Sequence, residues 1–114
     1  MQNTFVEMLY FQVKPDKTEE FEALIRALKA EQEQREGCVS IRYFKRSYTF
    51  DGVEPGASPR EITRIVKCVK YYAYWEFDTT ENCGKANGWF FDRYAKAVSK
   101  LLIAPFDINS GDSI

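Results

Sequence analysis

The side chains of this chain with chemical potential are mostly aromatic. Aromatic residues make up 16% of its 114 residues, and the densest group is the stretch Tyr71–Phe77, YYAYWEF. Tyrosine hydroxyls and indole N–H groups donate hydrogen bonds while their rings pack against apolar surface. The composition therefore predicts an aromatic core in which some rings line a cavity.

The chain contains no histidine, and this absence removes several kinds of active site. Ser-His-Asp and Cys-His hydrolysis, facial-triad iron sites and histidine-ligated haem all require imidazole. The cysteines Cys38, Cys68 and Cys83 are odd in number and widely spaced. We expect them to be reduced, buried thiols, with no disulfide and no metal site.

The charges nearly cancel. There are 16 basic and 17 acidic residues, for a net charge of -1, so no overall field would attract nucleic acid or an anionic membrane. No basic leader opens the chain, and no apolar run approaches the ~18 residues that a membrane span requires. We expect a soluble, cytoplasmic protein.

The first half of the chain predicts a strand, a helix and a second strand. Residues 5–13 carry apolar residues on both faces of a period-two pattern. Asp16 and Glu19 have the spacing of a helix capping box, an apolar helical stripe follows, and Gly37 is a natural helix end. The polar residues 31–36 should project into solvent. Residues 38–50 alternate again as a second strand.

The second half begins with a long loop over residues 51–61, DGVEPGASPRE, which could be an arm, a lid or an extension of a hairpin. A third strand over residues 62–77 has two faces. One carries Val69, Tyr71, Ala73, Trp75 and Phe77 and should lie under the helices; the other carries Cys68, Lys70, Tyr72, Tyr74 and Glu76.

After this strand the pattern becomes helical. Asp78 or Thr79 can cap a helix that we expect to be interrupted around residues 84–88 and to resume over 89–102. A short strand over residues 106–108 and a flexible polar tail, 109–114, complete the chain.

The order of elements, β-α-β-β-α-β, predicts one α+β domain over residues 1–114 with a ferredoxin-like fold. Its helices should cover one face of a four-stranded antiparallel sheet. The other face is too apolar to remain in water, and no further segment of the chain covers it. A second copy would do so, which predicts a symmetric homodimer. The residues expected on this dimer face are Tyr10, Arg42, Phe44, Tyr72 and Tyr74.

Five short segments follow one another along these elements: VKPDK at 13–17, EEFEAL at 19–24, EGCV at 36–39, YAYWE at 72–76 and LLIAP at 101–105. With these segments in this order, the chain resembles the antibiotic biosynthesis monooxygenase family of dimeric α/β barrels. The resemblance implies that two sheets pair into such a barrel. Family members include cofactor-independent oxygenases of anthrones and quinols, haem-degrading enzymes and proteins of no assigned role.

In the oxygenases the pocket lies within each subunit, between sheet and helices, and Trp75 matches the tryptophan that lines it. Two positions depart from the pattern: Tyr71 replaces an asparagine, and Glu81 replaces a helix tyrosine. Arg93 is the candidate for a pocket arginine that stabilises an oxyanion. The resemblance thus makes Trp75 and Arg93 catalytic candidates, and the expected substrate-binding side chains are Tyr43, Tyr71, Trp75, Trp89 and Tyr94.

Two functions of different class follow. The first is a monooxygenase without cofactor that oxidises a small phenol, quinol or anthrone with O2. The second is a non-catalytic dimeric barrel that binds a small apolar ligand or serves an interaction role. The haem-degrading branch is disfavoured, because its haem histidine, helix tryptophan and first-strand asparagine fall near Tyr94, Gly84 and Met8.

Overall fold

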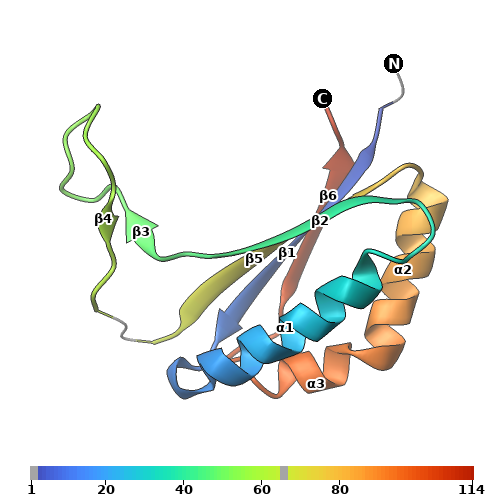
Figure 1. Ribbon diagram of the computed structural model, residues 1–114, viewed down its shortest axis with the longest axis horizontal. Helices are drawn as coiled ribbons and strands as arrows, with labels where there is room; N and C mark the ends of the chain where they lie inside the picture. Colours follow the sequence, from blue (N-terminus) through green and yellow to red (C-terminus); the bar gives the residue numbers. More distant parts are fainter. Residues whose placement is uncertain (1–2, 65–66) are drawn as a thin grey trace.

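The computed structural model describes residues 3–64 and 67–114. Its centre is a four-stranded antiparallel sheet in the order β2-β5-β1-β6 (Figure 1). Strands β1 (Phe5–Val13) and β5 (Val69–Phe77) pair along their whole length, and β2 (Cys38–Lys45) and β6 (Asp107–Asp112) form the edges. The predicted ferredoxin-like α+β fold is therefore confirmed.

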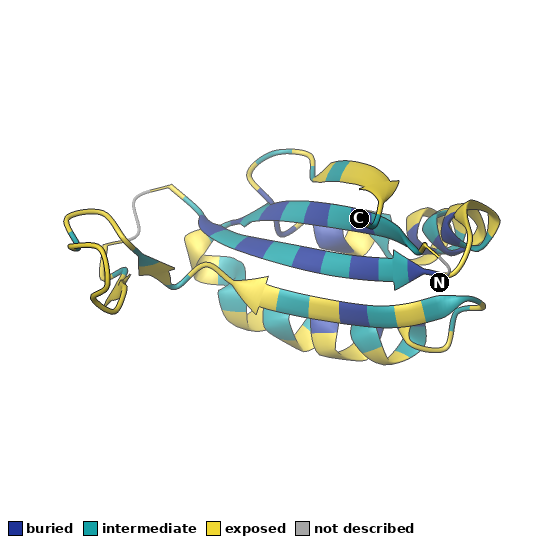
Figure 2. Cartoon of the chain, turned by 90° about the horizontal axis from the view of Figure 1, so that it is seen from above, coloured by how far each residue is buried: buried dark blue, intermediate teal, exposed yellow. Residues whose placement is uncertain are grey.

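Three helices cover one face of this sheet: α1 (Thr18–Gln32), α2 (Thr80–Arg93) and the short α3 (Ala95–Ser99) (Figure 1). Buried and partly exposed residues alternate along the central strands (Figure 2). The predicted parity of β5 is confirmed, since every helix-facing residue of this strand is at most 5% exposed. These residues are Val69, Tyr71, Ala73, Trp75 and Phe77.

The start of α1 differs from the prediction. A 3-10 turn, η1 (Pro15–Lys17), precedes the helix, and neither its N-cap, Lys14, nor that of α1, Lys17, makes a side-chain capping bond. The predicted capping box is therefore wrong. Proline suits the first position of a helical turn because it has no N–H to leave unpaired, so Pro15 begins the turn without help from Asp16.

Helix α2 also differs, because it runs unbroken through Gly84 and Gly88. Both glycines are exposed, and an added Cβ at either would meet nothing within 4 Å. Packing of the buried face outweighs the ~1 kcal/mol that each glycine costs a helix. The predicted interruption at 84–88 is wrong, and the break lies at Tyr94, between α2 and α3. The predicted cap is confirmed, since the Thr79 hydroxyl accepts a hydrogen bond from the Asn82 N–H at 3.1 Å.

The predicted second strand is shorter than expected. A bulge between Cys38 and Ser40 turns Val39 outward, where it is 54% exposed, and β2 ends at Lys45. Strand β3 (Tyr48–Thr49) then pairs with β4 (Arg60–Glu61) to form an arm that projects beyond the sheet (Figure 1). The 51–61 segment is therefore the outer part of this ribbon. Of the predicted strand over 62–77, the regular part begins at Val69, and residues 65–66 lie outside the described residues.

The C-terminal segment is more ordered than the sequence indicated. Strand β6 extends to Asp112 and pairs with β1, with Asp112 opposite Phe5. Residues 109–112 are thus part of the sheet, whereas a flexible tail was expected from 109 onward. Backbone hydrogen bonds hold an edge strand even where its side chains are polar.

The three cysteines are free, as expected, although only Cys83 is fully buried. Over residues 3–64 and 67–114, no helix combines the length and apolar character needed to cross a membrane.

Candidate functional site

The sheet face opposite the helices carries the five predicted dimer-face residues. The Tyr72 ring stacks between those of Tyr10 and Phe44, with centroids 5.0 and 4.9 Å away. Arg42 and Tyr74 lie opposite each other in the β2–β5 register. Phe44 remains 57% exposed. We call these five residues the open face.

A hollow of about 470 Å³ lies along one edge of the open face. Aromatic rings, a guanidinium and a carboxylate line it, so it offers both apolar and charged surface. Its lining residues are Ser40, Arg42, Tyr43, Phe44, Tyr74 and Glu76.

The helix-covered face of the sheet contains a carboxylate. Glu7 lies on β1 directly opposite Trp75 of β5 and is only 2% exposed. Its Oε2 atom has no hydrogen-bond partner among the described residues. Burial raises the pKa of Glu7 from 4.5 to about 7, because desolvation disfavours the charged form. Glu7 is thus a buried acid in a largely apolar core, and its Oε2 is unpaired among the described residues.

Three further buried polar atoms, on β5 and on the helices, also lack partners in the described part of the chain. Trp75 Nε1 on β5 and Gln32 Nε2 on α1 are unpaired donors, and Asn87 Oδ1 on α2 is an unpaired acceptor. Gln32 is fully buried, and its Oε1 accepts a hydrogen bond from the Tyr43 hydroxyl at 2.8 Å. We call Glu7, Gln32, Tyr43, Trp75 and Asn87 the interior polar cluster.

The charge of Glu7 on β1 affects the pKa values of two other groups, one on β2 and one on α2. The pKa of Tyr43 is raised mainly by burial, lowered in part by its bond to Gln32, and raised further by the charge of Glu7. The pKa of Cys83 is raised to about 11 by burial and by Glu7. Since Cys83 lies one turn before Asn87 on α2, the helix side of the cluster is close to the carboxylate as well.

The interior polar cluster is costly for folding. Each buried polar atom without a partner lowers the free energy of unfolding by about 1–3 kcal/mol, and an apolar residue of the same shape would not carry this desolvation penalty. Among residues 3–64 and 67–114, two buried donors and two buried acceptors are without partners.

Thiol chemistry is not favoured at this site. Cys38 lies close enough to the Trp75 indole for that group to lower its pKa, but burial has the larger effect and raises it. With the pKa of Cys83 at about 11, both thiols stay protonated at neutral pH, and the thiolate is the nucleophilic form.

The structure brings two of the predicted pocket residues, Trp75 and Tyr43, into the interior polar cluster. Tyr71 lies on the same face of the sheet, where its hydroxyl donates a hydrogen bond to Glu22 and its ring packs 4.7 Å from that of Phe21. Both burial and the neighbouring Glu22 raise the pKa of Tyr71. Its role in binding stays a prediction.

The remaining predicted residues gather at the far end of α2. The Trp89 and Tyr94 rings are 5.6 Å apart, and the Arg35 guanidinium lies 4.4 Å from the Trp89 centroid. Arg93 is 63% exposed in its side chain and forms an ion pair with Glu31 at 3.5 Å. Arg93 therefore joins α2 to α1 at the surface, and its catalytic assignment stays a prediction.

Three members of the cluster were missed at the level of sequence, namely Glu7, Gln32 and Asn87. A signal existed for two of them. Glu7 occupies a helix-facing position in the period-two pattern of the first strand, and Gln32 continues the apolar stripe of α1 four residues after Leu28. The expectation that residues 31–36 all lie in solvent is corrected by the complete burial of Gln32.

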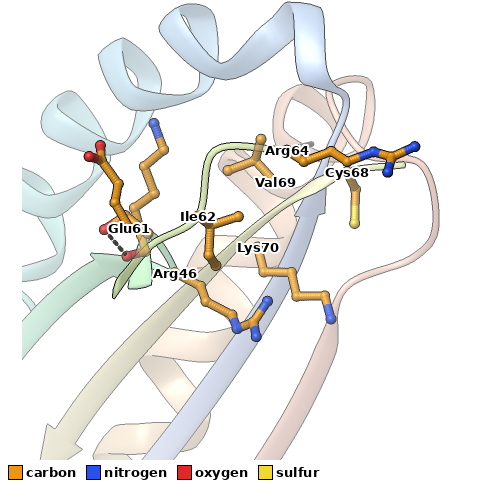
Figure 3. Close-up of a pocket in the computed structure, with 9 residues that line it drawn as sticks. Arg46, Glu61, Ile62, Arg64, Cys68, Val69 and Lys70 are labelled. Atoms are coloured by element: carbon orange, nitrogen blue, oxygen red, sulfur yellow. Dashed lines mark hydrogen bonds between the residues drawn. The ribbon is translucent and has the colours of Figure 1, made fainter. Parts of the chain in front are cut away.

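A separate basic pocket of about 190 Å³ lies at the base of the arm (Figure 3). Arg46 and Lys70 extend toward the same side of it, whereas Arg64 points away from them (Figure 3). Its charged side chains are exposed except that of Lys70, which is half-buried. The pocket shares no lining residue with the interior polar cluster.

Comparison with known proteins agrees with this architecture. Residues 4–52 match the family model described as antibiotic biosynthesis monooxygenase. A search of curated proteins finds no match.

Solved structures match over nearly the whole chain. A putative antibiotic biosynthesis monooxygenase from Nitrosomonas europaea is 14% identical, with a TM-score of 0.74 over 100% of this chain and 93% of that one. One from Bordetella bronchiseptica is 15% identical, with a TM-score of 0.68 and 99% of each chain covered.

A monooxygenase from the gene ActVA-Orf6 of Streptomyces coelicolor, in complex with the ligand nanaomycin D, is 14% identical, with a TM-score of 0.68 over 98% of this chain and 88% of that one. At such identities the structural likeness concerns the fold. The predicted resemblance to the antibiotic biosynthesis monooxygenase family is confirmed by the sequence match over residues 4–52 and by the shared fold over nearly the whole chain.

Proposed function

We propose that this protein is a monooxygenase that oxidises a small phenol, quinol or anthrone with O2, without a cofactor, in the space between sheet and helices. The observation that carries the proposal is the interior polar cluster, where Trp75 lies opposite a buried carboxylate and unpaired donors and acceptors face an aromatic core. A neighbour of the same fold was solved with the aromatic ligand nanaomycin D, which supports an aromatic substrate here.

The chemistry requires a substrate whose anion can pass an electron to oxygen. The protein's contribution is then to exclude water, hold the ring system flat and stabilise the charge that develops on its oxygen. The Gln32 amide is a donor for such an oxygen, since its Nε2 has no partner among the described residues. The Trp75 indole N–H is a second donor, with only the weakly accepting Cys38 sulfur beside it. For an anthrone the balance is simple: the CH2 group and O2 give a carbonyl group and one water.

We also propose that two copies pair through the open face. Aromatic rings stacked on an uncovered sheet would be removed from water by a second sheet. The resulting homodimer is the form in which we expect the enzyme to act. We propose no role for nucleic acid or a membrane.

Oxygen uptake tests the proposed function. Wild-type protein should consume O2 with members of a panel of hydroquinones and anthrones, and Trp75→Ala should lower the rate by about 10²-fold, because a misplaced substrate reacts slowly. Trp75→Phe keeps an aromatic wall but removes the N–H donor, and its rate should fall between the two. Phe50→Ala, at an exposed position on the arm, is the control and should match wild type.

The alternative function gives a different result in the same assay. A non-catalytic barrel would bind panel members in a way that depends on Trp75 but would consume no more O2 than a sample without protein. That outcome across the panel would refute the monooxygenase and favour the ligand-binding barrel.

A further inference from the structure

We propose that Glu7 is the proton acceptor for the phenolic or carbon acid bound beside Trp75, and hence the general base of the oxygenation. This inference rests on the proposed function and names the residue that starts the reaction. It concerns a side chain that neither the family resemblance nor the predicted site includes.

The position of Glu7 carries the first part of the argument. It lies on the helix-covered face of β1, opposite Trp75, with 2% of its surface exposed. The ion pairs of the described residues do not include Glu7, and its Oε2 accepts no hydrogen bond from them. A carboxylate left unpaired in a core destabilises the fold, so folding gives no reason for its presence here.

The surroundings of Glu7 carry the second part. Tyr43 on β2 and Cys83 on α2 are the titratable groups on which the charge of Glu7 acts. Cys38 on β2 is a further titratable group, beside Trp75, and burial raises the pKa of its thiol. The remaining members of the cluster, Gln32, Trp75 and Asn87, do not titrate. Because no cation neutralises it within the cluster, the carboxylate keeps its capacity to accept a proton.

The acidity of Glu7 suits this role. A general base works best when its pKa is near the pH of the reaction, and burial raises the pKa of Glu7 to about 7. Burial raises the pKa of Tyr43 as well, and that of Cys83 to about 11. A titration seen near pH 7 in this cluster would therefore be that of Glu7.

The proton can be followed through the whole reaction of an anthrone. Glu7 takes a proton from the CH2 group, whose electron pair stays on the substrate, and the resulting anion adds O2 to form a peroxide anion. The protonated Glu7 returns its proton to the distal peroxide oxygen. The regenerated carboxylate then removes the second hydrogen from that carbon as a proton, and the C–H electron pair forms the carbonyl group as the O–O bond breaks and hydroxide leaves. The proton now on Glu7 passes to this hydroxide, which gives water and restores the carboxylate. No other oxidant or reductant is needed.

The first test is the pH dependence of kcat/KM for oxygen uptake. Wild type should show a rising limb with a midpoint near pH 7, since the base must be ionised in the free enzyme. Glu7→Gln should lose the limb and about 10²–10⁴-fold in kcat/KM with substrates that are neutral at the assay pH. Glu81→Gln, at an exposed position in the first turn of α2, is the matched control and should keep both the limb and the rate.

Substrate ionisation separates a base from a structural residue. With a hydroquinone that is already an anion at the assay pH, Glu7→Gln should approach the wild-type rate, because no proton has to be removed. Glu7→Leu, which has no polar group to place in the core, should show the same dependence on substrate ionisation. An equal loss with neutral and ionised substrates, or no loss with either, would overturn the proposal.

A binding measurement keeps this inference separate from the proposed function. Quinizarin, a hydroxyanthraquinone that is followed by its visible absorbance and whose own hydroxyl groups stay protonated near neutral pH, should bind wild type with an affinity that changes near pH 7. It should bind Glu7→Gln without that change. If this holds while no panel member is oxidised, the proposed monooxygenase function is refuted but Glu7 is supported as the proton acceptor of a binding site. If wild type fails to bind quinizarin, or if both proteins show the same pH dependence, the inference about Glu7 is wrong.

Discussion

Replacement of Glu7 by glutamine should stabilise the protein at neutral and higher pH, even as it abolishes the proposed chemistry. Burial raises the pKa of Glu7 from 4.5 to about 7 in the folded protein. Between these values the folded state holds a proton that the unfolded state has lost. The free energy of unfolding therefore falls as pH rises through this window and is constant above it with respect to this group.

The magnitude follows from the size of the pKa change. One pKa unit corresponds to about 1.4 kcal/mol, so the ionised carboxylate should cost the folded state about 3 kcal/mol above pH 7. Glutamine has nearly the same shape and cannot ionise. The difference in unfolding free energy between Glu7→Gln and wild type should be small near pH 4.5 and should rise by about 3 kcal/mol toward pH 8.

Urea unfolding of both proteins at a series of pH values measures this difference directly. Other carboxylates act equally on the two proteins and cancel in the comparison. Glu81→Gln, which removes one carboxylate at an exposed position, is again the control. A difference for Glu7→Gln that stays constant across the series would refute the reasoning, because it would mean that Glu7 titrates alike in the folded and unfolded chain.

Two further predictions concern the open face and the turn after α1. Light scattering should give wild type a mass of twice the 13.3 kDa of one chain, and Tyr72→Glu should reduce it to the mass of a monomer. Ala27→Glu, on the exposed side of α1, is the control and should remain dimeric. A dimeric Tyr72→Glu protein would contradict the proposed interface. Gly37→Ala should lower the unfolding free energy by about 2 kcal/mol or more, because Gly37 has a φ of +80° and an added Cβ would lie 2.2 Å from Asp78 Oδ1. Gly52→Ala is the control, because Gly52 has a φ of +72° but no atom within 4 Å of an added Cβ. Equal losses of unfolding free energy in the two variants would mean that the contact with Asp78 contributes nothing to the loss at Gly37.

The sequence by itself determined the main elements and the faces of the central strand. Alternation along β5 separates Tyr71 and Trp75 from Tyr72 and Tyr74, and the structure confirms that separation. The reason is that successive side chains of a strand point to opposite faces whatever the rest of the fold does. The order of the elements then limits the sheet to few arrangements, of which the observed β2-β5-β1-β6 order is the ferredoxin-like one.

Boundaries that depend on distant partners were decided only by the tertiary structure. Gly84 and Gly88 interrupt a helical pattern, yet α2 continues through them because its other side packs against the sheet. The polar sequence of β6 has no strand periodicity, and its strand exists because β1 offers unpaired backbone groups to it. Strand β1 is about a hundred residues away from β6 in the sequence, and it is also part of the sheet surface against which α2 packs.

The candidate site divides in the same way. Trp75 could be identified from the sequence through its place at the end of an aromatic strand and through the family resemblance, and the parity of β1 is enough to place Glu7 on the helix-covered face. Whether a buried carboxylate finds a cation or a hydrogen-bond donor depends on residues from β2, β5, α1 and α2 that meet only in the folded protein. Among the described residues Glu7 forms no ion pair and its Oε2 accepts no hydrogen bond. Burial therefore raises its pKa to about 7 without a partner to oppose the change, and this makes it the candidate base.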